Sequence, residues 1–235
     1  MIQPMRSLGT FLALMALAQG IVACARNMQT ETPHLAQGAV TELPPPVHSS
    51  EVSLEEALAS RRSIREYGDQ PLSVIELGQL LWAAQGITDE RGFRAAPSAG
   101  ALYPLETYLA TAEGVFQYDP HNHQLELMST KDARPALYQA ALQQEAVLTA
   151  PAVFVLTAVY ARTAQKYGTE RSPRYVHLEA GHAAQNLLLQ ATALELGAVP
   201  IGAFSDKDVR KALGLPEDQQ PLYLIPVGHP WEPGG

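Results

Sequence analysis

The sequence has a single cysteine and a deficit of positive charge. Because Cys24 stands alone among 235 residues, the chain forms no intrachain disulfide and no zinc site built from several thiolates. Lysine and arginine number 16 against 24 aspartate and glutamate residues, which gives a formal net charge of −8. General nucleic-acid binders carry a basic surface, so this balance argues against nucleic acid as a partner.

Metal-binding patterns are also lacking. His177 and His182 lie five residues apart in a predicted helix and therefore on different faces, whereas a zinc-binding helix places two histidines four residues apart. We expect no metal site.

The one long apolar run lies at the N-terminus, where residues 8–22 follow a short basic segment. It is too short and too interrupted for a membrane span. With Ile21-Val22-Ala23-Cys24 at its end, it resembles a bacterial lipoprotein signal. This resemblance implies a signal peptide over 1–23, a lipidated Cys24, and a membrane-anchored lipoprotein on the periplasmic or extracytoplasmic side.

Proline and polar residues dominate residues 24–51, which we expect to form a flexible tether. The hydrophobic content of 46% is enough for a sizeable core. We expect one folded domain over 52–230 and a tail over 231–235.

Arginines cluster after the first predicted helix of this domain. Ser53 and Glu56 form a capping-box pattern, which starts a helix running towards Arg61. Arg61, Arg62, Ser63 and Arg65 then follow within five residues. The planar donor fork of arginine suits a phosphate. The alternative is a solvated basic turn that pairs with Glu55, Glu56 and Glu66.

Hydrophobic periodicity predicts the remaining elements and an α+β fold. Helices are expected from Ser73 to Gly86 and over 133–147, 174–196 and 206–213, with a glycine-rich loop over 91–103. Strands are expected over 105–111, 115–118, 124–127, 152–159, 198–204 and 222–227. The apolar run at 152–159 indicates a central strand buried on both faces.

The predicted helix at 174–196 carries a polar stripe as well as an apolar face. The stripe consists of Tyr175, Glu179, His182 and Asn186. A buried polar group without a hydrogen bond costs about 1–3 kcal/mol, so these residues need partners. A second subunit is one source of them.

Several segments in order resemble the nitroreductase superfamily of flavoenzymes over 52–228. They include the RRSIREYGDQPLS, PSAGALYPLE, KYG, YVHLEAGHAAQN and PIGAF segments. The first four are similar to the azoline-dehydrogenase branch, the SagB/ThcOx type. The resemblance implies an α+β sheet with packed helices, in an intertwined homodimer that holds two FMN molecules at the subunit interface.

The resemblance also implies site residues. Arg61, Ser63 and Arg65, with Arg62 beside them, correspond to residues that bind the flavin phosphate, ribityl chain and ring edge. The loop offered by the partner subunit matches Pro97, Ser98, Ala99 and Gly100. Gln144 corresponds to an amide at the ring edge, and Pro200, Ile201, Gly202 and Ala203 match the turn whose N–H groups face the flavin nitrogen that accepts hydride. Small residues in both loops would let the main chain approach a flat ring.

Lys166 and Tyr167 correspond to a Lys-Tyr pair that the azoline-dehydrogenase branch uses to remove a proton while hydride passes to the flavin. The alternative is an exposed lysine beside a packing tyrosine.

The sequence thus predicts an FMN-dependent oxidoreductase. Its substrate would be an azoline in a peptide, or a small nitroaromatic or quinone. A non-catalytic lipoprotein that binds a flavin or another ligand is the alternative, and bleaching and reoxidation of a bound yellow chromophore during turnover would separate the two. Azoline dehydrogenases usually act in the cytoplasm beside a cyclising partner, which does not fit an exported lipoprotein.

Overall fold

The computed structural model describes residue 35 and residues 39–231. The predicted signal peptide, Cys24, the first part of the predicted tether and residues 232–235 lie outside the described residues. No helix among the described residues has the length and apolar character needed to cross a membrane.

The fold is a seven-stranded sheet in the order β1-β4-β3-β2-β5-β7-β6, with antiparallel pairing between all neighbours. The strands are β1 (Val40–Glu42), β2 (Leu105–Thr111), β3 (Gly114–Asp119), β4 (Gln124–Ser129), β5 (Ala152–Val159), β6 (Gly197–Ala198) and β7 (Gln219–Gly228). The expected α+β class is confirmed.

Strand β5 occupies the position that its apolar run predicts. It pairs with β2 on one edge and with β7 on the other. Phe154 and Leu156 point into one core cluster, whereas Val153 and Val155 point into the other. All four side chains have 0% exposure, so both faces of the strand are covered.

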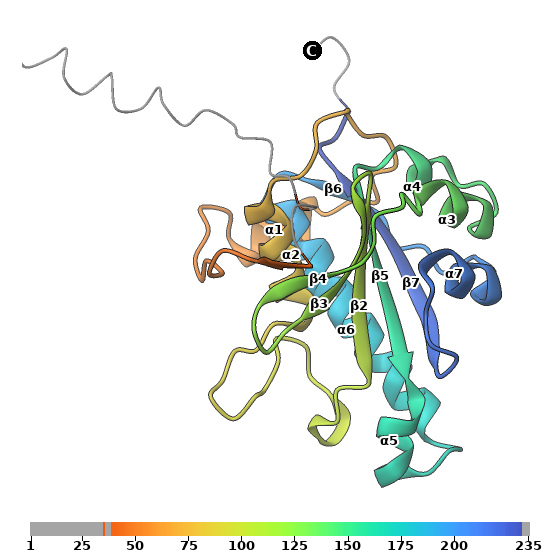
Figure 1. The fold of residues 1–235 in the computed structure, drawn as a ribbon. Helices are drawn as coiled ribbons and strands as arrows, with labels where there is room; N and C mark the ends of the chain where they lie inside the picture. Colours follow the sequence, from red (N-terminus) through yellow and green to blue (C-terminus); the bar gives the residue numbers. More distant parts are fainter. Residues whose placement is uncertain (1–34, 36–38, 232–235) are drawn as a thin grey trace, which may run out of the picture. The chain divides into compact units, whose positions relative to one another are not determined.

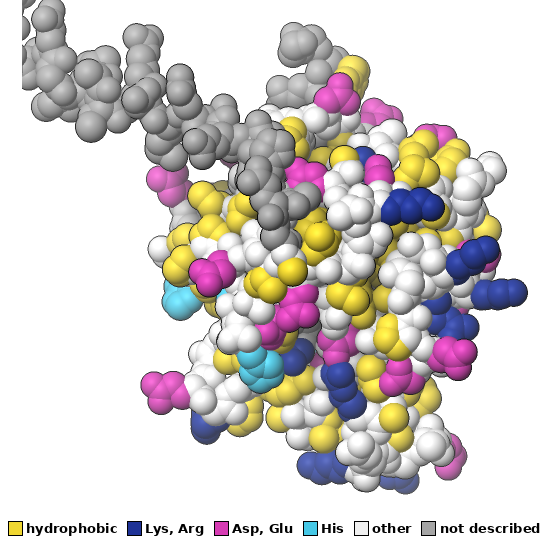
Figure 2. All heavy atoms as spheres, viewed as in Figure 1, with side chains coloured by type: hydrophobic (Ala, Val, Ile, Leu, Met, Phe, Trp, Pro, Cys, Tyr) yellow, Lys and Arg dark blue, Asp and Glu magenta, His cyan; other side chains and the backbone are white. Residues whose placement is uncertain are grey.

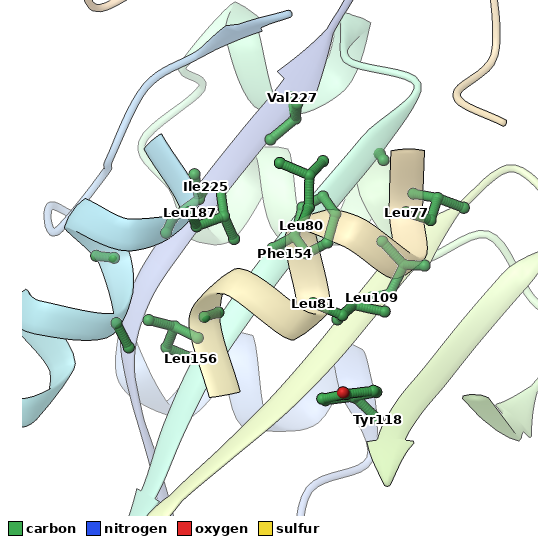
Figure 3. Close-up of a cluster of buried hydrophobic side chains, with 14 of the residues drawn as sticks. Leu77, Leu80, Leu81, Leu109, Tyr118, Phe154, Leu156, Leu187, Ile225 and Val227 are labelled. Carbon is green, nitrogen blue, oxygen red and sulfur yellow. The ribbon is translucent and has the colours of Figure 1, made fainter. Parts of the chain in front are cut away.

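Helices cover both faces of the sheet (Figure 1). They are α1 (Leu54–Ser60), α2 (Val74–Gln85), α3 (Arg134–Ala140), α4 (Glu145–Thr149), α5 (Tyr160–Tyr167), α6 (Ser172–Ala193) and α7 (Asp206–Leu213). Helices α2 and α6 pack on one face, where leucines of α2 meet Leu187 of α6 and side chains of β2, β5 and β7 (Figure 3). Helices α3, α4 and α7 pack on the other face.

The predicted capping boxes start the first two helices. Ser53 accepts a hydrogen bond from the Glu56 N–H at 3.1 Å, and the Glu56 carboxylate accepts one from the Ser53 N–H at 2.8 Å. Ser73 and Glu76 form the same reciprocal pair at the start of α2. These caps satisfy main-chain donors that a helix leaves free at its N-terminus, and they place Arg61 at the C-terminal end of α1.

The expected continuous helix over 133–147 is wrong. Leu142 and Gln143 adopt left-handed φ values of 56° and 59°, which end α3 and turn the chain before α4. The break brings Gln144 against Ala203, and its side-chain amide donates to the Ala203 carbonyl at 3.1 Å. Local hydrogen bonds also hold the turn, since the Gln143 N–H donates to the Tyr138 carbonyl at 2.9 Å and the Gln144 side chain donates to the Ala141 carbonyl at 3.0 Å. The strand expected over 198–204 is likewise shorter, because β6 covers only Gly197–Ala198.

The predicted end of the tether, at residue 51, lies too far towards the C-terminus. Strand β1 lies within it and pairs with β4, and Leu43 just after β1 is 7% exposed. Leu35 is 4% exposed, and its N–H donates to the Glu113 carboxylate at 2.6 Å. The folded part thus includes residues well before the predicted boundary at residue 52.

Removal of residues 1–51 should lower the free energy of unfolding relative to removal of residues 1–32. The larger deletion loses Leu35, Leu43 and the β1 pairing, and burial of each leucine contributes about 1.5–3 kcal/mol. Urea unfolding of both variants measures the difference, which we expect to be about 3 kcal/mol or more. Equal midpoints and slopes would contradict the assignment of β1 to the domain.

Candidate functional site

The arginine turn runs beside the short strand β6. The Ile64 N–H donates to the Ala198 carbonyl at 3.1 Å, and Ser63 forms a parallel bridge with Ala198. Gly197 lies directly under Ile64, since a Cβ on this glycine would stand 2.6 Å from the Ile64 Cγ2. A glycine is therefore required for the turn to approach β6 this closely.

The guanidinium groups of this turn are not paired with carboxylates. Arg62 donates to the carbonyls of Ala59 and Arg61 at 3.0 and 2.8 Å, and both Arg62 and Arg65 are exposed. Within residues 39–231, neither these two nor Arg61 forms a salt bridge. The predicted ion pairs with neighbouring glutamates are not formed, and the positive charge of the turn stays available to an anion.

The turn over 200–203 extends from β6 and meets Gln144. Ile201 exchanges two main-chain hydrogen bonds with Leu224 of β7, at 2.8 and 3.0 Å. Gly202 and Ala203 beyond it are exposed, and their N–H groups donate to no acceptor among the described residues. The structure thus brings the Arg61–Arg65 turn, the 200–203 turn and Gln144 into one continuous region, which we call the arginine group.

The other predicted residues form a second region, which we call the lysine group. Gly100 has φ 66° and lies against the end of α5. A Cβ on Gly100 would stand 2.9 Å from the Lys166 Nζ and 3.1 Å from the Tyr167 hydroxyl. The Pro97–Gly100 loop and the Lys-Tyr pair, which are far apart in sequence, therefore face one another within one subunit.

Tyr175 completes the lysine group from helix α6. Its ring lies 4.5 Å from the Tyr167 ring between centroids, and the Lys166 Nζ lies 5.7 Å from the Tyr167 centroid. The ring of Tyr175 therefore packs within its own subunit. The expectation that a second subunit supplies partners to the polar stripe of α6 is wrong for Glu179, which is 2% exposed and buried within its own subunit.

A half-buried polar network adjoins the Pro97–Gly100 loop through Tyr103, whose N–H donates to the Ser98 Oγ at 2.9 Å. Arg94 donates to the Gln85 side chain at 2.8 Å and stacks over the Tyr103 ring at 4.7 Å. Arg162 donates to the Tyr103 carbonyl at 3.1 Å and pairs with Glu106. The sequence analysis assigned no role to Arg94, Tyr103, Arg162 or Glu106, although Tyr103 and Glu106 lie in the PSAGALYPLE segment.

Burial is the largest influence on the pKa of Glu179. Burial raises the pKa of Glu179 to about 7, while hydrogen bonding by the Ser98 side chain and the charge of Arg94 act to lower it. Burial lowers the pKa of Arg94, and the nearby carboxylates Glu106 and Glu179 oppose that shift. No group of three or more potential metal ligands occurs among the described residues.

The Arg61–Arg65 turn and the lysine group lie at different ends of the sheet, and the 200–203 turn lies between them, because Ile201 bonds with Leu224, which pairs with Val155 in the middle of β5. Ala198 of the arginine group pairs with Val227, which pairs with Ala152 at the start of β5. The lysine group lies beyond the other end, where the Val159 N–H donates to the Pro104 carbonyl at 2.8 Å. At about 3.3 Å per residue, the seven steps from Ala152 to Val159 span roughly 23 Å. Figure 1 shows β6 and α5 at opposite ends of the view.

Apolar side chains are exposed on one side of the subunit. A groove of about 480 Å³ lies between α1, α2, α6 and the segment before α1, and its lining includes Val47, Leu54 and Ile75. Leu58 of α1 and Leu178 of α6 are exposed by 54% and 55%. Figure 2 shows hydrophobic side chains on the left of its view, over α1 and the segment before it.

Comparison with known proteins gives consistent matches. A chain from Methanocaldococcus jannaschii that is named as a nitroreductase is 46% identical over 184 residues, covering 76% of this chain and 91% of the relative. A crystal structure from Ralstonia eutropha, also named as a nitroreductase, superposes with a TM-score of 0.77 at 31% identity and covers 83% of this chain and 91% of that one.

A more distant structure is the NADPH:FMN oxidoreductase from Vibrio harveyi in complex with NAD+. It is 25% identical, has a TM-score of 0.58, and covers 76% of this chain and 69% of its own. The family model for the nitroreductase family matches residues 58–229, which include both the arginine group and the lysine group. The chain belongs to the nitroreductase family.

Proposed function

We propose that this protein is an FMN-dependent oxidoreductase that transfers hydride between its flavin and an organic substrate. The observation that carries the proposal is the arginine group, where cationic side chains and unpaired main-chain N–H groups are joined around β6. The names of the M. jannaschii and V. harveyi relatives support the same class of reaction.

The residues of the arginine group fit FMN chemically. Arg61, Arg62 and Arg65 supply charged donors for a terminal phosphate, and Ser63 adds a hydroxyl. The N–H groups of the 200–203 turn would stabilise negative charge on a reduced ring. FMN fits better than a dinucleotide, because no glycine-rich dinucleotide fingerprint follows any strand. When bound, the flavin supplies the hydride-transfer chemistry.

The lysine group supplies groups that hold or move a proton. The Lys166 amine and the Tyr167 hydroxyl both lie within about 3 Å of the position that a Gly100 side chain would occupy. Each group can exchange a proton with a substrate held beside the loop. This arrangement suits a nitroaromatic or quinone reductase, which must deliver protons, and an azoline-type dehydrogenase, which must remove one.

The separation of the two groups supports a homodimer. A site within one subunit would leave the Arg61–Arg65 turn and the lysine group at opposite ends of β5, with the 200–203 turn between them. A two-fold axis would instead bring the arginine group of one subunit to the lysine group of its partner. The apolar groove and the exposed leucines of α1 and α6 provide surface for such an interface.

Replacement of Arg61 or Arg65 by alanine should weaken FMN binding by about tenfold to a hundredfold. Each change removes a charge-assisted hydrogen bond worth about 1.5–3 kcal/mol. Fluorescence titration of the flavin-free protein gives the Kd, and Lys131→Ala is the control because Lys131 is an exposed cation outside the arginine group. Wild-type affinity in both arginine variants, or recovery of FAD from the purified protein, would refute the assignment.

The variants Lys166→Ala and Tyr167→Phe should lower kcat with a nitroaromatic or quinone acceptor by about 10²-fold or more, because a positioned acid or base contributes typically 10²–10⁴-fold. Their FMN Kd should stay within about threefold of wild type, since neither residue is assigned to the phosphate. Gln165→Ala, an exposed neighbour in α5, is the control. An unchanged kcat in both variants would show that Lys166 and Tyr167 have only a structural role.

Light scattering of the holoprotein should give the mass of a dimer. Leu178→Arg places a charge on the exposed face of α6 and should shift the protein towards monomer, with loss of bound flavin. Leu148→Arg is the matched control, because Leu148 is also exposed, at 37%, but lies on α4 across the sheet. A wild-type monomer with full flavin content at micromolar concentration would exclude the shared site.

A further inference from the structure

The segment from Pro97 to Tyr103 has a backbone that needs external support. Gly100, Ala101 and Tyr103 have φ values of 66°, 54° and 46°. Residues with a Cβ disfavour this left-handed region, and two of these three have one. The segment keeps this conformation only if surrounding contacts hold it there.

Several of the contacts that hold the segment are made by Tyr103. Its N–H donates to the Ser98 Oγ at 2.9 Å, and its hydroxyl accepts from the main-chain N–H of Arg94 at 3.2 Å. Ser98 and Arg94 belong to the same stretch of chain as Tyr103. The Tyr103 carbonyl, however, accepts from the Arg162 side chain of α5 at 3.1 Å, 59 residues away in sequence. Arg162 therefore fixes Tyr103 against α5.

Arg162 and Lys166 lie on the same side of α5. They are four residues apart, so their side chains leave the helix one turn from each other. Arg162 reaches the Tyr103 carbonyl, and one turn later the Lys166 Nζ stands 2.9 Å from the position of a Gly100 Cβ. One side of α5 thus contacts the strained segment at both Tyr103 and Gly100, and the bond made by Arg162 sets where Lys166 meets the loop.

Glu106 of β2 holds the Arg162 guanidinium. One carboxylate oxygen of Glu106 pairs with Arg162, and the other accepts from the Gln117 side chain of β3 at 3.1 Å. Arg162 thus joins α5 to the sheet through Glu106 and to the loop through the Tyr103 carbonyl. Its side chain is 41% exposed, and an ion pair this exposed contributes little to the free energy of unfolding. We expect the pair to act on local geometry more than on global stability.

Other side chains of α5 hold the helix against α6. In the described part of the chain, the Tyr160 hydroxyl forms a hydrogen bond with the His177 Nε2 at 2.7 Å. The Tyr167 ring packs against the Tyr175 ring, with 4.5 Å between centroids. Loss of the Arg162 side chain would therefore leave α5 in place on α6 and free the loop to move away from the Lys-Tyr pair.

We propose that Arg162 is a positioning residue, which together with Glu106 holds the Pro97–Gly100 loop at the distance from Lys166 and Tyr167 that proton transfer requires. Its effect on turnover rests on the proposed function, whereas its hold on the loop does not. Misplacement of a reacting group by about 1 Å costs up to roughly 10²-fold in rate, so a small movement of the loop is enough to be measured.

Reoxidation of the reduced holoprotein tests the effect on turnover. The holoprotein is reduced with dithionite, and its reoxidation by menadione is followed in the absence of oxygen. Arg162→Gln should lower the rate at saturating menadione by about tenfold or more and leave the Kd of FMN within about threefold of wild type.

The matched control is Arg134→Gln. Arg134 also pairs with a carboxylate, that of Asp132, and donates to a main-chain carbonyl, that of Ala150 at 3.0 Å. It makes these contacts from α3, away from the lysine group. Its reoxidation rate should therefore stay within about threefold of wild type.

A combined variant separates positioning from a general loss of structure. If Arg162 acts through the Lys-Tyr pair, Arg162→Gln should change the rate by less than about threefold in the Lys166→Ala, Tyr167→Phe background. The same loss in that background as in wild type would overturn the proposal, and so would a wild-type rate in Arg162→Gln.

Should Arg162→Gln not fold, Glu106→Gln provides the second test, because it keeps the shape and removes the charge that holds the guanidinium. Its rate should fall by about fivefold or more, and only where Lys166 and Tyr167 are intact. A wild-type rate in Glu106→Gln would refute the role of the pair.

Hydrogen exchange of the flavin-free protein tests the hold on the loop without any flavin chemistry. The Ala101 N–H donates to the Ser98 carbonyl at 3.0 Å, and the Tyr103 N–H donates to the Ser98 Oγ. In Arg162→Gln, the opening constant of these two amides should rise about tenfold, while that of the α6 amides stays within about threefold of wild type. In Arg134→Gln, the two amides should exchange as in wild type. Wild-type protection in Arg162→Gln, or an equal rise throughout the chain, would refute the positioning role.

The two experiments distinguish failure of this proposal from failure of the proposed function. If neither the wild type nor any variant binds FMN, the proposed function fails, and the exchange data still decide whether Arg162 holds the loop. If FMN binds and the exchange rises in Arg162→Gln while the reoxidation rate does not fall, the loop is held by Arg162 but its position does not limit proton transfer. That result would overturn the role of Arg162 in turnover.

Discussion

The burial of strand β5 on both faces and along both edges is the constraint on which the remaining structure depends. Its side chains alternate between the core under α2 and α6 and the core under α3, α4 and α7. Burial along β5 is unbroken from Ala152 to Ala158, whereas burial along β7 is interrupted at Gln220, Leu222 and Tyr223. The Arg61–Arg65 turn and the lysine group lie beyond the two ends of this strand, so its length sets the distance between them.

Much of the fold could be predicted because its signals are local. The Ser53–Glu56 and Ser73–Glu76 pairs each lie within four residues, and the apolar run of β5 is continuous. Elements that depend on distant contacts were missed. Strand β1 pairs with β4, more than 80 residues further along the chain, and the break before α4 is accompanied by the contact between Gln144 and Ala203.

The same difference between local signals and distant contacts applies to the candidate site. Composition and resemblance named the candidate residues but did not divide them into two groups, because the division depends on sheet register. A second subunit was expected as one source of partners for the polar stripe of α6, and the spacing along the helix cannot reveal that Glu179 is buried inside its own subunit. The support that Arg94 and Arg162 give to Tyr103 likewise depends on positions that only the folded chain brings together.

The distance between the arginine group and the lysine group has a genetic consequence. If each site takes one group from each subunit, a chain defective in Arg61 and a chain defective in Lys166 are both inactive alone. In a mixed dimer of the two chains, both defects fall in the same site, and the second site receives only intact residues. Two null alleles of this gene should therefore complement one another when they are expressed in the same cell, whereas two alleles altered in the same group should not.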